Sequence, residues 1–307
     1  MIKQLFENRE FLIGILLLTV ILSASFINTQ FFKQDLDNIS KEEYLANKPS
    51  PPSLEHPFGT SQGGIDLFDQ ILSHTFPTIK MALFITVGRM AVSLILGFLY
   101  GLQYKKLKWM DLFIEGFHFV PATLLAFLLL YGLNFMNFEF FMENPDFRWY
   151  FIAFTLIAIG IPTLMQLIGR ETNLVLQNEF IDSAKILGGN RIHILLKHVV
   201  PSLRGKLFLI FSSQLIAVLT LMMHVSILGY FIPGWTAFIG SNYYELMLSP
   251  WIIFFPVLLF ALLIISLTLI ANGFRNTLEG EYYSRRSTFL ESSTTYSLPF
   301  RKKDISI

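Results

Sequence analysis

The residues best suited to chemistry or to recognition lie close together at 179–203, EFIDSAKILGGNRIHILLKHVVPSL. The stretch mixes acidic, basic and imidazole side chains: Glu179, Asp182, Lys185, Arg191, His193, Lys197 and His198. His193 and His198 are five residues apart, so an α-helix would not place them on one face as an i, i+4 pair. Because the chain also has no cysteine, the pair predicts no metal site. A polar segment of this kind instead indicates contact with another protein.

The same stretch predicts two short helices with a turn between them. Phe180, Ala184 and Leu187 recur at helical spacing on one side of the first helix. Gly188-Gly189 can end that helix, because glycine accepts the left-handed conformation of a helix C-terminus. Asn190 is a suitable N-cap for a second helix.

The second helix is predicted to end at Pro201, which marks a break before the next apolar run. The residues expected on one face of this helix are Ile192, Leu195, Leu196 and Val199. The two short helices together are predicted to form a compact projection that a partner protein can bind.

Arg89 is the other residue that could do chemistry, because it falls within a long apolar run. It lies ten residues past Ile79, or ~15 Å into the run at 1.5 Å per residue. An ionisable group at that depth is a functional candidate by default. Arg89 is therefore a candidate for a translocation pathway, where it could meet a substrate carboxylate. The alternative is a structural hydrogen bond to a neighbouring helix.

The elements that must position these residues are membrane helices. The 307 residues are 53% hydrophobic and only 15% charged, well below the charge of a soluble domain. The net charge of +1 provides no basic field for nucleic acid. The long apolar blocks predict an all-α integral membrane protein with six spans, at about 11–27, 79–102, 112–133, 149–168, 207–231 and 251–271.

The distribution of Lys and Arg orients these spans. Of the 23 Lys and Arg residues, 17 fall in segments on the side of the N-terminus and five on the other side, with Arg89 inside a span. Both termini and the 179–203 stretch are therefore expected in the cytoplasm. The alternative of a cleaved signal peptide at the N-terminus would disrupt this alternation.

This topology divides the chain into four parts. Residues 1–28 hold the N-terminal segment and first span, and 29–78 form an extracytoplasmic loop. Residues 79–280 form the core, with a cytoplasmic loop at 171–206 between spans four and five. Residues 281–307 are a polar Ser/Thr-rich tail, expected to be disordered or loosely held on the membrane surface.

Three motifs resemble permease subunits of binding-protein-dependent ABC importers, in the peptide and nickel branch. Residues 179–203 resemble the EAA loop, which is roughly E-A-A-x-x-x-G followed by I-x-L-P. The positions that match this loop or its peptide-branch form are Glu179, Phe180, Asp182, Ser183, Ala184, Lys185, Leu187, Gly188, Arg191, His198 and Pro201. HPFGTSQGGIDLFDQIL (56–72) resembles H-P-L-G-T-D-x-x-G-R-D, and SPWIIFFP (249–256) with NGFRNTLEG (272–280) resembles the last span and its exit.

The resemblance implies a bacterial inner-membrane permease that couples to ATPase subunits through the EAA loop. It implies a second homologous permease, two ATPase subunits, an extracytoplasmic substrate-binding protein and the lipid bilayer as partners. No cofactor is expected on this chain, since ATP and Mg²⁺ would bind the ATPase subunits. The sequence contains no P-loop, H-E-x-x-H or G-x-S-x-G signature, so it predicts a transport subunit rather than an enzyme.

The outer motif departs from the family pattern, with Ile65 in place of an arginine and Ser61 in place of an aspartate. These departures leave the substrate open. Two other functions also stay open at this point. One is an ATP-independent secondary transporter, which would call for a cluster of intramembrane carboxylates. The other is a non-transporting membrane sensor or scaffold.

Overall fold

The computed structural model describes residues 2–31, 47–136 and 138–295, and residues 1, 32–46, 137 and 296–307 fall outside the description. Within the described residues the fold is helical, and Thr60 and Asp66 form one isolated antiparallel bridge. The α-helices are α1 (Ile2–Glu7), α2 (Arg9–Phe31), α4 (Leu67–Leu102), α5 (Tyr104–Leu107), α6 (Trp109–His118), α7 (Ala122–Met136), α8 (Phe138–Glu143), α9 (Pro145–Leu176), α10 (Glu179–Ile186), α11 (Arg191–Ile194), α12 (Val200–Ile227), α13 (Trp235–Asn242) and α14 (Trp251–Thr295). Shorter turns are η2 (Gln62–Gly64), the π-helical η3 (Leu195–Val199) and η4 (Tyr243–Met247).

Five stretches are long and apolar enough to cross a bilayer: Arg9–Gln30, Leu67–Leu102, Pro145–Leu176, Arg191–Ile227 and Trp251–Leu278. They cover five of the six predicted spans, and most of these helices extend further than the apolar runs suggest. The predicted fifth span ran to Phe231, whereas α12 ends at Ile227. Gly229 follows with a φ of 101°, a conformation that ends a helix.

The predicted third span, 112–133, is not one helix. It is divided between α6 and α7, with Phe119, Val120 and Pro121 between them. Pro121 has no backbone N–H, and its ring disfavours helical geometry in the residue before it. The apolar part of α7 is only a short membrane-type helix, Ala122–Gly132. The prediction of helical structure in this apolar run is confirmed, but the prediction of one continuous helix is wrong.

The predicted tail is helical at residues 281–295, where α14 continues through Thr295, so the alternative of disorder is wrong for these residues. Residues 281–295 contain no proline or glycine to end the helix. Residues 296–307, the rest of that predicted tail, lie outside the described residues, as do 32–46 of the predicted outer loop.

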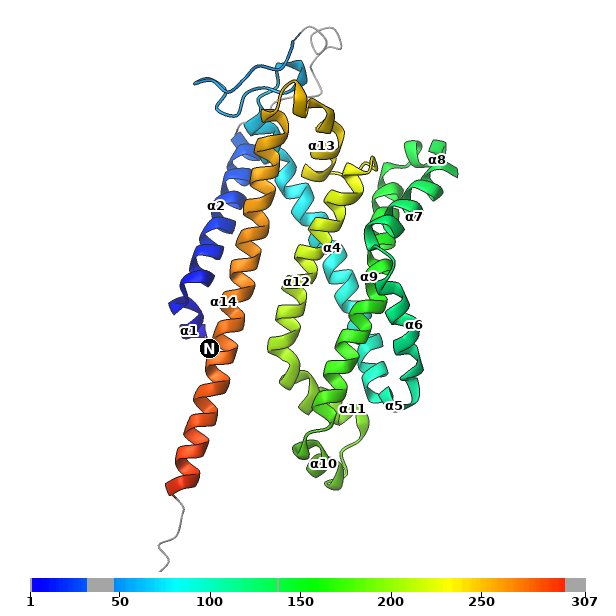
Figure 1. The fold of residues 1–307 in the computed structure, drawn as a ribbon, viewed down its shortest axis with the longest axis vertical. Helices are drawn as coiled ribbons and strands as arrows, with labels where there is room; N and C mark the ends of the chain where they lie inside the picture. Colours follow the sequence, from blue (N-terminus) through cyan, green and yellow to red (C-terminus); the bar gives the residue numbers. More distant parts are fainter. Residues whose placement is uncertain (1, 32–46, 137, 296–307) are drawn as a thin grey trace, which may run out of the picture.

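The predicted cytoplasmic and outer segments separate along the long axis of the molecule. Figure 1 shows α5, α10 and α11 at one end, and α13 and α8 near the opposite end. Helix α2 runs beside α14, while α4, α9 and α12 form the centre and α6 and α7 lie on the far side. Segments predicted for one side of the membrane therefore lie at one end of the structure.

Small residues let the central helices approach closely. Helices α4 and α9 make the largest helix–helix interface of the chain. A Cβ on Gly97 would lie 2.8 Å from the Cβ of Ile168, and one on Gly101 would lie 2.6 Å from the Cβ of Thr172. Such contacts require glycine, as in other membrane helix pairs where small residues bring backbones together.

The outer motif and the start of the last span pack against each other. Trp251 donates from Nε1 to the carbonyl of Thr60 at 3.2 Å, and Phe58 stacks on Phe255 with ring centroids 4.2 Å apart. Ile65 and Ser61, which depart from the family pattern, are both buried in this assembly. Two of the motif stretches seen in the sequence are thus one structural unit.

A fully buried tryptophan connects α13 to α4. Trp235 is completely buried, and its Nε1 donates to the carbonyl of Ile71 at 2.6 Å. The backbone N–H of Trp235 also donates to the hydroxyl of Thr78 at 2.8 Å. Trp235 therefore joins α13 to α4 inside the protein.

Candidate functional site

The turn after α10 has the geometry that the glycine pair predicts. Gly188 has a φ of 85°, the backbone N–H of Gly188 donates to the carbonyl of Lys185, and that of Gly189 donates to the carbonyl of Ala184, both at 3.0 Å. These two hydrogen bonds form a Schellman motif with Gly188 as the left-handed residue. No atom lies within 4 Å of a Cβ built on Gly188, so only backbone conformation restricts this position.

The second half of the loop begins as predicted and ends differently. Asn190 caps α11 by accepting a hydrogen bond from the backbone N–H of His193 at 2.7 Å. Pro201 does not break the chain, because it lies in the first turn of α12, where its missing N–H is tolerated. The π-helical turn η3 precedes it, so Arg191–Ile227 forms one helical stretch. The predicted break is wrong, and the loop joins directly onto a spanning helix.

A small apolar core holds the two halves of this loop against the long helices. Its fully or almost fully buried members are Ile181, Ile194, Val199 and Leu203. Phe98 of α4 and Leu176 of α9 pack against them. The loop is therefore packed onto α4, α9 and α12 rather than hanging from them.

Five other apolar side chains of the loop point into solvent. The exposed fractions are 86% for Ile186, 87% for Leu187, 66% for Ile192, 62% for Leu196 and 47% for Phe180. We call these five residues the apolar tip. The sequence predicted Phe180, Ala184 and Leu187 on one side of the first helix and Ile192, Leu195, Leu196 and Val199 on one face of the second. The buried positions are Ile181, Ile194 and Val199, of which only Val199 was in a predicted group. The turn at Gly188 decides which positions face inward, and periodicity alone did not reveal that.

A shallow cavity of about 440 Å³ adjoins the apolar tip, lined by Phe180, Ser183, Ala184, Leu187, Gly188, Gly189, Asn190, His193 and His198. The imidazole rings of His193 and His198 lie 6.3 Å apart on this cavity. The prediction that spacing would separate these two rings is wrong, because the π-helical turn shifts the register between them. Ala184 also lies on this cavity.

The charged residues of the loop lie around its surface. Lys185 forms an ion pair with Asp182 at 2.7 Å, within one turn of α10. Glu179 lies in the first turn of α10, where its charge favours the helix dipole. Arg191 begins α11 and lies on a different cavity from the histidines.

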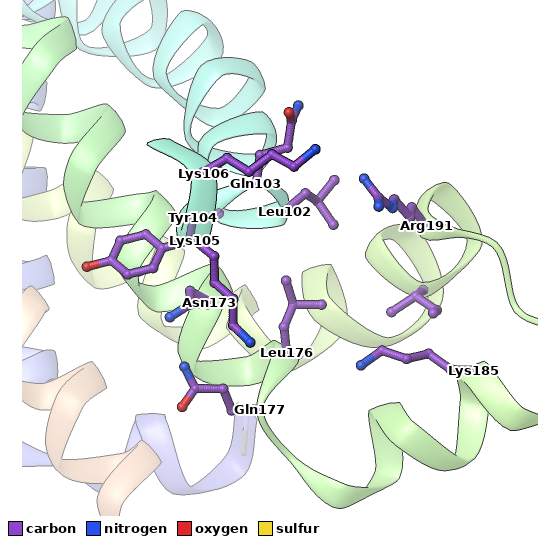
Figure 2. A pocket seen from close by; sticks show the side chains of 12 residues that line it. Leu102, Gln103, Tyr104, Lys105, Lys106, Asn173, Leu176, Gln177, Lys185 and Arg191 are labelled. Atoms are coloured by element: carbon purple, nitrogen blue, oxygen red, sulfur yellow. The ribbon is translucent and has the colours of Figure 1, made fainter. Parts of the chain in front are cut away.

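That second cavity, about 470 Å³, carries a basic lining. Four cationic residues take part, Lys105 and Lys106 of α5, Lys185 of α10 and Arg191 of α11. Figure 2 shows their side chains reaching toward one hollow from two sides, with Asn173 of α9 and Gln177, the residue after α9, on its wall. No acidic residue lines this cavity, so it has the chemistry to receive an acidic segment.

A buried carboxylate that the sequence analysis did not single out holds the neighbouring helices together. Asp111 of α6 accepts hydrogen bonds from Tyr100 (2.6 Å), Gln166 (2.7 Å) and Tyr104 (2.9 Å). Arg170 lies 3.4 Å from the same carboxylate and pairs with Glu115 at 2.8 Å. The available signal was an aspartate at the start of an apolar run.

The electrostatics of Asp111 follow from these partners. The three hydrogen bonds and the positive charge of Arg170, 3.4 Å away, all favour the ionised form of the Asp111 carboxylate. The hydrogen bond to this carboxylate, followed by burial, raises the pKa of Tyr104. Asp111 is therefore an ionised link between α4, α6 and α9.

Arg89 forms a structural hydrogen bond to a neighbouring helix and also lines a cavity, so its position agrees with features of both interpretations. Its Nε and Nη2 donate to the backbone carbonyl of Leu156 in α9, at 2.8 and 2.5 Å. Its side chain is only 4% exposed, and it also lines a cavity between α4, α7, α9 and α12. Gly160 makes room for it, because a Cβ there would come within 2.6 Å of the guanidinium carbon.

These features define a multi-pass membrane component with a rigid, partly apolar projection built on its spanning helices. Comparison with known families agrees, since residues 93–280 match the model of the binding-protein-dependent transport system inner membrane component. The matched part exceeds half of the chain and includes the whole 179–203 loop. The chain therefore belongs to this family of inner-membrane transport components.

Individual relatives extend the similarity over most of the chain. The dipeptide transport system permease protein DppC of Alkalihalophilus pseudofirmus is 24% identical over 289 residues, covering 90% of this chain and 88% of its own. The oligopeptide transport system permease protein OppC of Bacillus subtilis is 20% identical over 291 residues, covering 89% and 86%. The oligopeptide transport system permease protein AmiD of Streptococcus pneumoniae is 24% identical over 276 residues, covering 88% and 85%.

Proposed function

We propose that this chain is one half of the membrane pathway of an ATP-driven peptide importer. It pairs with a second homologous permease, receives substrate from an extracytoplasmic binding protein and is driven by two ATPase subunits. The peptide assignment is supported by the three relatives, which are named as dipeptide or oligopeptide permeases. ATP and Mg²⁺ bind the ATPase subunits in this proposal.

The topology that fits this function has six crossings with both termini in the cytoplasm. Helices α6 and α7 together make the third crossing, despite the break at Pro121. The tip and the basic cavity then face the cytoplasm, in accord with the excess of Lys and Arg on that side. The outer motif at 56–72 and α13 face the binding protein.

The single observation that carries the coupling role is the contrast within the 179–203 loop. Ile181 is completely buried and anchors α10, whereas Leu187, six residues further on, is 87% exposed. Apolar side chains held in water by a packed scaffold are typical of a surface that a partner covers. We assign the apolar tip and its cavity as the contact with an ATPase subunit.

The connection to the spanning helices gives this contact a mechanical consequence. The loop continues without interruption into α12 and packs on α4 and α9 through Phe98 and Leu176. A displacement of the tip is therefore delivered to three spanning helices as a nearly rigid movement. Such movements switch packed helices between two discrete arrangements.

The basic cavity adds charge recognition to the apolar contact. Lys105 and Lys106 come from a different connection than Lys185 and Arg191, so the cavity spans two cytoplasmic segments. An acidic segment of the ATPase placed there would touch both. Charge complementarity of this kind contributes mostly to association rate and to partner choice.

The experiment is a pull-down of the tagged chain from its native membrane in mild detergent, with ATPase activity measured on each eluate. Wild type is compared with Gly188→Pro, which cannot adopt a φ of 85° and removes the N–H bonded to Lys185. Gly116→Ala is the matched control, because Gly116 lies inside α6 with open space around its Cβ.

We expect wild type and the control to bring down an ATPase and a second permease. Gly188→Pro should retain the second permease and lose the ATPase by at least tenfold. Retention of the ATPase by Gly188→Pro, or no ATPase with wild type even after crosslinking, would show that the loop is not the coupling element.

A further inference from the structure

Arg89 is a buried cation with no anion beside it. It is 96% removed from solvent, and its hydrogen-bond partner, the carbonyl of Leu156, is neutral. Among the described residues no acidic side chain forms an ion pair with it. Guanidinium stays protonated under all conditions relevant to a protein. Burying such a charge without a counter-ion is costly, so a site that retains one is arranged for an anion.

The cavity beside Arg89 has the dimensions and lining of a ligand site. Its volume is about 440 Å³, and α4, α7, α9 and α12 all contribute to its wall. The polar side chains on the wall are Thr123, Thr163, Gln214, Thr220 and His224, and the remaining lining is apolar or glycine. Among the described residues, no acidic or lysine side chain lines it, and Arg89 is the one fixed charge of this lining.

The hydrogen bonds of Arg89 leave donors available for a ligand. Nε and Nη2 share one acceptor, the carbonyl of Leu156, so Nη1 and the second proton of Nη2 are not used by that bond. The bond to α9 fixes the direction of the guanidinium, which reduces the ordering cost of binding. Gly160 leaves open the space through which the group reaches the cavity.

We infer that this cavity is an anion subsite within the membrane part of the chain, in which Arg89 holds the carboxylate of a passing substrate. The hydroxyl, amide and imidazole groups on the wall complete the polar surroundings of that carboxylate. The inference rests on the proposed function for the identity of the substrate as a peptide. The anion subsite itself does not depend on that identity.

The absence of cysteine from the chain makes a direct test practical. Ala217, on the α12 side of the cavity, is replaced by cysteine in the assembled importer, whose other subunits have their accessible cysteines replaced. The complex is placed in lipid nanodiscs so that both faces are open to solution. Labelling rates are measured with an anionic sulfonate and a cationic trimethylammonium methanethiosulfonate reagent of similar size.

The ratio of the two rates reports the charge of the cavity. We expect Ala217→Cys to favour the anionic reagent, and we expect Arg89→Gln to reduce that ratio by on the order of tenfold or more. Ser53→Cys, on the exposed outer loop, is the control whose ratio Arg89→Gln should leave unchanged. Gly160→Ala should lower the ratio at Ala217→Cys as well, because it displaces the guanidinium.

Two results would overturn the subsite. The first is a ratio that does not respond to Arg89→Gln, which would mean that another subunit neutralises Arg89. The second is an Ala217→Cys thiol that reacts with neither reagent, which would mean that the cavity excludes water and ions.

Protection of the Ala217→Cys thiol by added peptides then tests whether the cavity binds a carboxylate. Trialanine should slow labelling of Ala217→Cys by about threefold or more, and trialanine amide, which lacks only the carboxylate, should not. Equal protection by the two peptides, or none, would remove the carboxylate from the proposal. These outcomes are independent of the pull-down with Gly188→Pro, so failure of the subsite and failure of the coupling role are distinguishable.

Discussion

The apolar tip and the Arg89 cavity are opposite exceptions to the usual distribution of side chains. At the tip, Ile186 and Leu187 lie in solvent, each more than 85% exposed. In the cavity, a permanent positive charge lies between apolar helices at 4% exposure. Each arrangement costs free energy in the isolated chain, and a binding partner would relieve each cost.

Both exceptions are held in place by ordinary packing. Ile181 and Ile194 anchor the tip, and the carbonyl of Leu156 directs the guanidinium. Asp111 shows what a buried charge looks like when the fold itself supplies the partners. It has three hydrogen bonds and a nearby arginine, whereas Arg89 has one neutral acceptor. The comparison separates charges that stabilise the fold from a charge available for function.

The largest expected effect comes from replacing exposed apolar side chains of the apolar tip by charged ones. We expect Ile186→Asp combined with Leu187→Asp to weaken ATPase binding by about 3 kcal/mol, on the order of a hundredfold, because two exposed contact residues become charged. Thermal unfolding of the purified chain should stay within about 0.5 kcal/mol of wild type, since neither side chain is buried. Titration of the ATPase onto immobilised permease measures the first quantity. Equal binding by the double variant would mean that the tip is not the contact.

A smaller effect is expected on protein stability when Asp111, the buried charge that the fold itself supplies with partners, is changed. Asp111→Asn removes the ionised acceptor and turns one oxygen into a donor facing Tyr104, so we expect a loss of about 2 kcal/mol in unfolding free energy. Denaturation monitored by tryptophan fluorescence measures the change, with Glu115→Gln as the exposed control. An unchanged stability for Asp111→Asn would contradict the role of Asp111 as a link between helices.

The smallest expected effect is a gain in stability rather than a loss, and it distinguishes Arg89 most directly from Asp111. Arg89→Met keeps the volume and removes the unpaired charge, so we expect the isolated chain to become more stable by about 1 kcal/mol. Transport by the assembled complex should fall at the same time. The same denaturation assay, paired with peptide uptake in cells, measures both quantities. If Arg89→Met destabilises the chain, Arg89 is a charge that stabilises the fold, as Asp111 is.

Much of the fold follows from local sequence. Apolar blocks longer than a bilayer crossing predict spanning helices wherever they occur, and five of the six predicted crossings have a long apolar helix. Gly188 and Asn190 predicted the turn and the cap of the 179–203 loop, because left-handed backbone and N-capping are properties of single residues in a local context. These features need no information from distant parts of the chain.

Other features depended on contacts between distant segments. The sequence placed Pro201 at a break, but packing of Val199 and Leu203 against α4 and α9 keeps the helix continuous. It placed Ile192 and Val199 on one face of the second helix, whereas the structure buries Val199 together with Ile194 and leaves Ile192 exposed. It did not identify Asp111, whose partners lie 11 and 55 residues away.

The sequence by itself determined the membrane class, the turn at Gly188 and the presence of a charge at Arg89 within an apolar run. Each of these depends on composition or on a few consecutive residues. Only the tertiary structure decided which apolar side chains of the loop remain in solvent, and that Arg89 faces both Leu156 and a cavity. Those outcomes depend on how α4, α9 and α12 pack together, because burial and the supply of hydrogen-bond partners are properties of the assembled helices.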